Sequence, residues 1–124
     1  MGQITSPIVI IASASDWQAA LKTGTYTMST VDKSGQDVGF LHGSFPNQTI
    51  GIANRHYAGH HDLVILLIDP EKVTSPVKYE GALSGRPGTF PHIYGPLNTD
   101  AVILVSPLAE DANGHFVWPA GLSV

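Results

Sequence analysis

The pattern of hydrophobic and polar positions predicts a series of short strands and two helices. Three apolar runs, at residues 7–11, 63–68 and 101–105, lack polar alternation, so we expect buried strands there, with 63–68 covered on both faces. Segments rich in β-branched and aromatic residues, set between turn-forming residues, predict further extended structure at residues 25–30, 38–41, 77–81 and 115–118.

The first helix is expected where apolar residues recur at spacings of three and four. Ser13 or Ser15 is placed to cap its start. Gly24 is expected to end it, because glycine adopts the left-handed conformation that closes many helices. The residues that share its apolar face are Trp17, Ala20 and Leu21.

The second helix is expected over residues 47–57, with Ser44 as its N-cap and Pro46 in its first turn. The order is then strand, helix, strand, helix and strands only. That order predicts an α+β fold with a central mixed or antiparallel sheet and two short helices. With 124 residues and no linker-like stretch, residues 1–124 are expected to form a single domain.

Composition and charge narrow the classes of partner. The net charge is −4 and only 13% of residues are charged, which argues against a partner as long as DNA or RNA. One bound nucleotide needs only a few local donors. The chain has no cysteine, no signal-peptide pattern and no apolar run long enough to span a bilayer. We therefore expect a cytoplasmic protein without membrane contact, and the oligomeric state stays open.

Two segments carry most of the candidate chemistry. Residues 90–97 combine His92 and Tyr94 with two prolines, so we expect a fixed, non-regular wall that presents a titratable group. Residues 39–44 end a strand at His42, next to a helix start whose free N–H groups suit an anionic ligand. If the two segments meet, both histidines line one concavity, with side chains within about 10 Å.

Glu80 is the candidate carboxylate. It follows a strand-like segment, and alternation places it on the same face as Lys78 and opposite Tyr79. A carboxylate that stabilises a developing cation must be ionised, so a cation such as Arg86 is expected to hold its pKa low. The alternative is an exposed carboxylate that only ties down a loop.

No metal site is expected. His56 and His60 have i, i+4 spacing, but Gly59 interrupts the helix between them, and no glutamate lies inside the pair as in a metalloprotease helix. The sequence also lacks a phosphate-binding P-loop, a dinucleotide-binding glycine fingerprint and a nucleophile elbow.

The ordered motifs of the chain resemble a small bacterial family known as domain of unknown function 952. The motifs that carry the likeness are Gly39-Phe40-Leu41-His42-x-Ser44, Gln48, His56-Tyr57-Ala58-Gly59, Asp62-Leu63-Val64, Lys78-Tyr79-Glu80, Phe90-Pro91-His92-Ile93-Tyr94-Gly95 and Phe116-Val117-Trp118-Pro119. The resemblance implies a fold like that of ADP-ribosyltransferases, which bind NAD between two small sheets. It also makes the run from His42 to Ser44 similar to the His-Gly-Ser or His-Gly-Thr that holds nicotinamide in many such enzymes.

The leading hypothesis is a nucleotide-binding domain that transfers ADP-ribose or processes NAD, the cofactor that the resemblance implies. His42, Glu80 and His92 are its candidate catalytic residues. The candidate nucleotide-binding residues are Ser44, Arg86 and Tyr94. Two alternatives stay open: cleavage of a phosphodiester or cyclic phosphate by the two histidines, and a non-catalytic module that binds a ligand or a partner.

Overall fold

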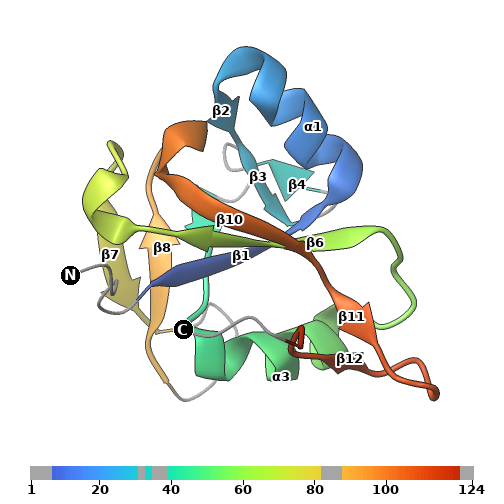
Figure 1. The fold of residues 1–124 in the computed structure, drawn as a ribbon. Helices are drawn as coiled ribbons and strands as arrows, with labels where there is room; N and C mark the ends of the chain where they lie inside the picture. Colours follow the sequence, from blue (N-terminus) through green and yellow to red (C-terminus); the bar gives the residue numbers. More distant parts are fainter. Residues whose placement is uncertain (1–6, 31–32, 35–38, 82–87, 121–124) are drawn as a thin grey trace.

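The computed structural model describes residues 7–30, 33–34, 39–81 and 88–120 (Figure 1). The helices in these ranges are α1 (Ala14–Thr23) and α3 (Pro46–His56), with short 3-10 turns at Pro70–Lys72 and Thr99–Ala101. The strands are β1 (Ile8–Ser13), β2 (Thr25–Tyr26), β3 (Met28–Thr30), β4 (Lys33–Ser34), β5 (Leu41–His42), β6 (Leu63–Ile68), β7 (Val77–Glu80), β8 (Phe90–Ile93), β9 (Leu97–Asn98), β10 (Val102–Pro107), β11 (Ala109–Glu110) and β12 (Phe116–Val117).

Two three-stranded sheets organise the described part of the chain. One has the order β1-β6-β10 and the other the order β5-β8-β7. Three shorter pairs join β2 to β9, β3 to β4 and β11 to β12, and every pair is antiparallel. The predicted α+β class with two helices is confirmed. The prediction left a mixed or an antiparallel sheet open, and the described sheets are antiparallel.

The sheet β1-β6-β10 is covered on both faces along β1 and β6. Ile8 and Ile10 share a cluster with Leu41 and Ile93 of the second sheet. Alternate residues of the same strands pack with Ala53 and Tyr57 of α3 and its C-terminal neighbour, so α3 covers the opposite face (Figure 1). The unbroken apolar runs therefore reflect burial on two sides, as predicted for residues 63–68.

Strand β10 corrects the prediction of a third buried strand at residues 101–105. It lies at the edge of its sheet and pairs only with β6 among the described strands. Ile103, Leu104 and Val105 are each about 40% exposed. Periodicity cannot separate an apolar edge strand from a central one, because the difference lies in how many neighbours the fold supplies.

Helix α1 follows the capping prediction closely. The Ser13 hydroxyl accepts the backbone N–H of Asp16 at 3.1 Å, and Gly24 closes the helix in the left-handed region with φ of 89°. The predicted apolar face is wrong in one member, since Trp17 and Ala20 are buried but Leu21 is 51% exposed. The buried face of α1 is therefore narrower than the apolar face that the residue spacing predicts.

Helix α3 begins at a different cap from the predicted one. Phe45 is the N-cap, and the side-chain oxygen of Gln48 accepts its backbone N–H at 2.9 Å. Ser44 is buried one residue earlier, where its backbone exchanges two hydrogen bonds with Val9. Its hydroxyl hydrogen-bonds the hydroxyl of Thr49 at 2.8 Å. Ser44 thus connects the start of α3 to β1 rather than capping the helix.

Pro91 lies inside the regular strand β8, although we expected a non-regular segment at residues 90–97. In an antiparallel ladder, the N and the C=O of one residue point to the same neighbour. The Pro91 carbonyl accepts the N–H of Gly43 at 2.9 Å, so the nitrogen that lacks a hydrogen faces the place where β5 has already ended. The middle strand β8 tolerates Pro91 because the proline nitrogen, which has no hydrogen to donate, points beyond the last residue of β5.

The strand expected at residues 7–11 extends to Ser13, whereas those expected at 77–81 and 115–118 are shorter than predicted. The strand expected at 38–41 is β5 at Leu41–His42, and Thr27 separates β2 from β3 within residues 25–30. None of the helices in the described ranges is both long and apolar enough to cross a membrane.

Candidate functional site

The sheet β5-β8-β7 has one face in the core and one face that gathers the candidate residues. Leu41 and Ile93 are opposite each other in the register and belong to the core cluster. The next pair is His42 opposite His92, and Lys78 of β7 is opposite His92 on the other side. Because residues directly opposite each other share a face, these three side chains form one row across the sheet.

Glu80 lies on the same face, two residues beyond Lys78, as the alternation predicted. Its Oε1 accepts two hydrogen bonds, from Nδ1 of His92 at 2.9 Å and from the Tyr94 hydroxyl at 2.5 Å. The side chain of Glu80 is 39% exposed, whereas that of His92 is 3% exposed. Within the described ranges no group hydrogen-bonds Oε2, so these residues fix one of the two carboxylate oxygens.

These contacts set the charge of Glu80. The hydrogen bond from Tyr94, followed by that from His92, lowers the pKa of the carboxyl group, and the positive charge of Lys78 adds to the effect. The same contact raises the pKa of the Tyr94 phenol, since the phenol donates to a carboxylate. Glu80 is therefore ionised at neutral pH, as expected, and the described groups that lower its pKa are Tyr94, His92 and Lys78.

The ionised carboxylate also fixes the protonation of one ring nitrogen of His92. A carboxylate only accepts hydrogen bonds, so Nδ1 must carry the hydrogen. In the neutral ring, Nε2 is then the nitrogen with the lone pair. Phe40 holds the ring in place, with its own ring stacked on it at a centroid distance of 4.1 Å.

His42 and His92 are neighbours, which confirms the distance predicted from the sequence. Their ring centroids are 5.8 Å apart, with one ring edge toward the other. The ring of Phe40 contacts both, at 4.9 Å from His42. The two sequence segments therefore meet through the pairing of β5 with β8.

Phe40 and Lys78 are site residues that our sequence-based set of candidates omitted. The Nζ of Lys78 lies 5.0 Å from the centroid of the Tyr94 ring, an arrangement typical of a cation–π contact. Alternation with Glu80 was the available signal for Lys78, and alternation with His42 was the signal for Phe40. The stacking of Phe40 on His92 itself leaves no pattern in the sequence that would predict it.

The structure does not support a site role for two other candidates, Arg86 and Ser44. Arg86 lies outside the described residues. Ser44 is 3% exposed and its hydroxyl is engaged by Thr49, so this geometry gives no support to a ligand-binding role for it. No group of three metal-binding side chains occurs among the described residues.

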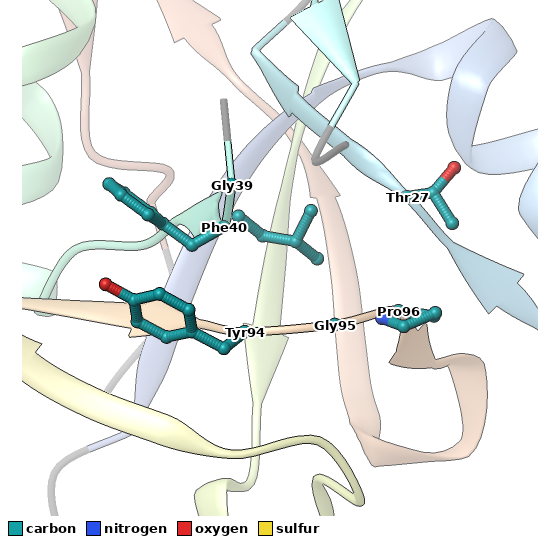
Figure 2. A pocket seen from close by; sticks show the side chains of 7 residues that line it. Thr27, Gly39, Phe40, Tyr94, Gly95 and Pro96 are labelled. Carbon is teal, nitrogen blue, oxygen red and sulfur yellow. The ribbon is translucent and has the colours of Figure 1, made fainter. Parts of the chain in front are cut away.

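A hollow of about 270 Å³ opens beside Tyr94 (Figure 2). Seven residues line it, namely Thr27, Gly39, Phe40, Leu41, Tyr94, Gly95 and Pro96. Tyr94 belongs to both features, because its ring lines the hollow and its hydroxyl binds Glu80. Neither histidine lines this hollow, so the shared concavity that we predicted for them stays a prediction.

Fold and site together define a small antiparallel α+β domain with a carboxylate held by a histidine and a tyrosine. The family model described as "Protein of unknown function (DUF952)" matches residues 11–105. The chain therefore belongs to the domain of unknown function 952 family, as its motifs indicated.

Solved structures of protein CC0527 from Caulobacter crescentus are similar to this chain. Its crystal structure is 28% identical, covers 90% of this chain and 93% of its own, and has a TM-score of 0.75. A double mutant of that protein gives the same TM-score and coverage at 29% identity. The solution NMR structure is 30% identical, covers 89% and 90% of the two chains, and has a TM-score of 0.72. No curated protein matches this sequence.

Proposed function

We propose that the chain binds a ribose-containing nucleotide over this face of the β5-β8-β7 sheet and cleaves or transfers at the ribosyl C–N bond. NAD is the donor that the resemblance noted in the sequence, with its expected fold like that of ADP-ribosyltransferases, implies. The observation that carries the proposal is Glu80, an ionised carboxylate on this face, with one oxygen fixed by His92 and Tyr94 and the other without a hydrogen-bond partner among the described residues.

A carboxylate in this state suits the chemistry of a leaving pyridine ring. As the bond between ribose C1′ and the nicotinamide nitrogen breaks, its electron pair leaves with nicotinamide and positive charge develops on the ribose. A fixed negative charge stabilises that transition state without having to reorganise. Water or another nucleophile then forms a bond to C1′ and gives up a proton. Glu80 would supply the charge, and His92 and Tyr94 would orient it.

The contact between His42 and His92 favours a second candidate, cleavage of a phosphodiester or cyclic phosphate by acid–base catalysis. The edge of one ring already contacts the other, with centroids 5.8 Å apart. A phosphate would therefore bind over the pair rather than between the two rings. This candidate also assigns no chemical task to Glu80 beyond orienting His92, and so it ranks second.

Nicotinamide release from NAD, followed by chromatography, tests the proposal. We expect Glu80→Gln to bind NAD but to lose about 10²–10³-fold in turnover, the usual cost of removing one charge-stabilising group. Glu71→Gln is the matched control, because Glu71 is an exposed carboxylate in the 3-10 turn Pro70–Lys72, outside the strands of this sheet. Equal turnover by the wild type and Glu80→Gln would refute the catalytic role.

The same assay separates the alternatives. Hydrolysis of a 2′,3′-cyclic nucleotide without NAD would establish the histidine-pair candidate. Saturable NAD binding with no product would leave a ligand-binding module.

A further inference from the structure

The hollow beside Tyr94 has the build of a slot for one flat ring. Phe40 and Tyr94 lie on one side of it, and Thr27 and Pro96 lie on the other (Figure 2). No charged residue is among the seven that line it. Two aromatic side chains and an uncharged wall favour a planar, mostly apolar group over a phosphate or an aliphatic chain.

Its size fits a part of a nucleotide rather than a whole one. The volume is about 270 Å³. Pockets that enclose a complete drug-sized ligand usually measure roughly 300–1,000 Å³. The hollow therefore has room for one heteroaromatic ring and a little of what is attached to it, while the rest of a dinucleotide would lie outside.

Contacts within the protein hold the part of the wall formed by Tyr94, Gly95 and Pro96. The Ser75 hydroxyl donates to the Pro96 carbonyl at 2.7 Å, which holds the turn after β8. Gly95 adopts φ of 147°, and a Cβ there would lie 2.5 Å from Ser75 Oγ, so only glycine fits. The Tyr94 ring is oriented by the hydrogen bond of its hydroxyl to Glu80. A preformed slot loses little entropy on binding, which favours affinity for a small rigid ring.

We infer that this hollow binds the heteroaromatic ring of the nucleotide, of the nicotinamide or adenine kind. The inference rests on the proposed function for the identity of the whole ligand and names the part of it that this surface holds. Tyr94 links the two features, since it lines the hollow and its hydroxyl binds the Glu80 carboxylate. The slot would thus set which base leaves, and Glu80 would act on the bond to it.

Free nicotinamide and free adenine are the probes, because neither carries ribose or phosphate. Binding is followed by chemical-shift changes in the protein, and so few atoms give dissociation constants on the order of 1 mM. At least one probe should shift the backbone amides of Gly39 and Gly95. Failure of both probes to give saturable shifts at these glycines overturns the inference.

Substitutions at two exposed threonines sharpen the test. Thr27 lines the hollow and Thr25 does not, although both side chains are exposed and only Tyr26 separates them in the chain. Thr27→Trp should fill the slot and weaken probe binding at least tenfold, while Thr25→Trp should leave it unchanged. Equal affinity in the two variants contradicts the inference. Amide shifts at Gly39 and Gly95 in the wild type give the same answer if Thr27→Trp folds poorly.

The two proposals fail separately. Probe binding in the slot without any cleavage of NAD refutes the proposed function and keeps the slot. Cleavage of NAD with a KM that Thr27→Trp does not change refutes the slot and keeps the function.

Discussion

Replacing Gly43 by alanine tests the contact that brings the two histidines together. Gly43 lies directly after His42, where β5 ends against β8, and its N–H binds the Pro91 carbonyl. A Cβ at this position would lie 2.8 Å from the Pro91 oxygen and 2.9 Å from the Cγ2 of Ile8. Both neighbours are buried, and one is backbone, so the two strands must separate to admit the methyl group.

The size of the effect follows from these distances. Forcing an extra carbon into a packed core costs about 1–3 kcal/mol. For 124 residues, the usual unfolding entropy per residue converts 1 kcal/mol into roughly 4 °C, so Gly43→Ala should lower the melting temperature by roughly 4–12 °C. Gly51→Ala is the matched control, because the nearest atom to its new Cβ is a flexible Arg55 nitrogen at 3.9 Å.

Circular dichroism during heating measures both variants. Alanine in the middle of α3 should raise stability by about 0.5–1 kcal/mol, or roughly 2–4 °C. If Gly43→Ala melts within about 1 °C of the wild type, β5 is not packed on Pro91 as described. The placement of His42 beside His92 would then lose its structural basis.

Three further substitutions test the site and its surroundings. Tyr94→Phe removes the hydrogen bond that most lowers the pKa of Glu80, so that pKa should rise toward 4.5 and activity that needs the carboxylate should fall off at a higher pH than in the wild type. In the wild type, the ionised Glu80 should stabilise the fold above pH 4.5, and this contribution should be lost as the pH falls from 4.5 through the lowered pKa. Acid unfolding of the wild type and of Tyr94→Phe measures the difference. Tyr26→Phe should leave stability unchanged or raise it by up to about 1 kcal/mol in urea unfolding, because the buried Tyr26 hydroxyl has no partner among the described residues, and a loss above that size would contradict this. Ser44→Ala should cost about 1 kcal/mol by breaking the link to Thr49 while leaving NAD affinity unchanged, and a loss of affinity in calorimetry would restore the ligand-binding role expected of Ser44.

The parts of the fold that depend on local pattern could be predicted from the sequence. Alternation placed Glu80 with Lys78, and the unbroken run at residues 63–68 indicated a strand covered on both sides. Capping chemistry gave both ends of α1, since Ser13 and Gly24 act on their immediate neighbours. Each of these rests on contacts within a few residues of the chain.

The errors arose where a distant neighbour decides the outcome. Pro91 fits a middle strand because β5 stops beside it, and nothing near Pro91 in the sequence encodes that end. The partners of Ser44 are Val9, 35 positions away, and Thr49. The donors His92 and Tyr94 reach Glu80 through the pairing of β7 with β8, which sequence proximity does not indicate, while the expected contact with Arg86 stays a prediction.

The crystal structure of the Glu80→Gln variant grown with NAD tests the central claim most directly, because the substitution should block cleavage and keep the ligand whole. We predict one heteroaromatic ring against Tyr94 in the hollow and ribose C1′ in contact with the side chain at position 80, at about 3.5–4 Å. Intact NAD bound on another face, or bound here with C1′ directed away from position 80, would contradict a role for Glu80 at the ribosyl bond.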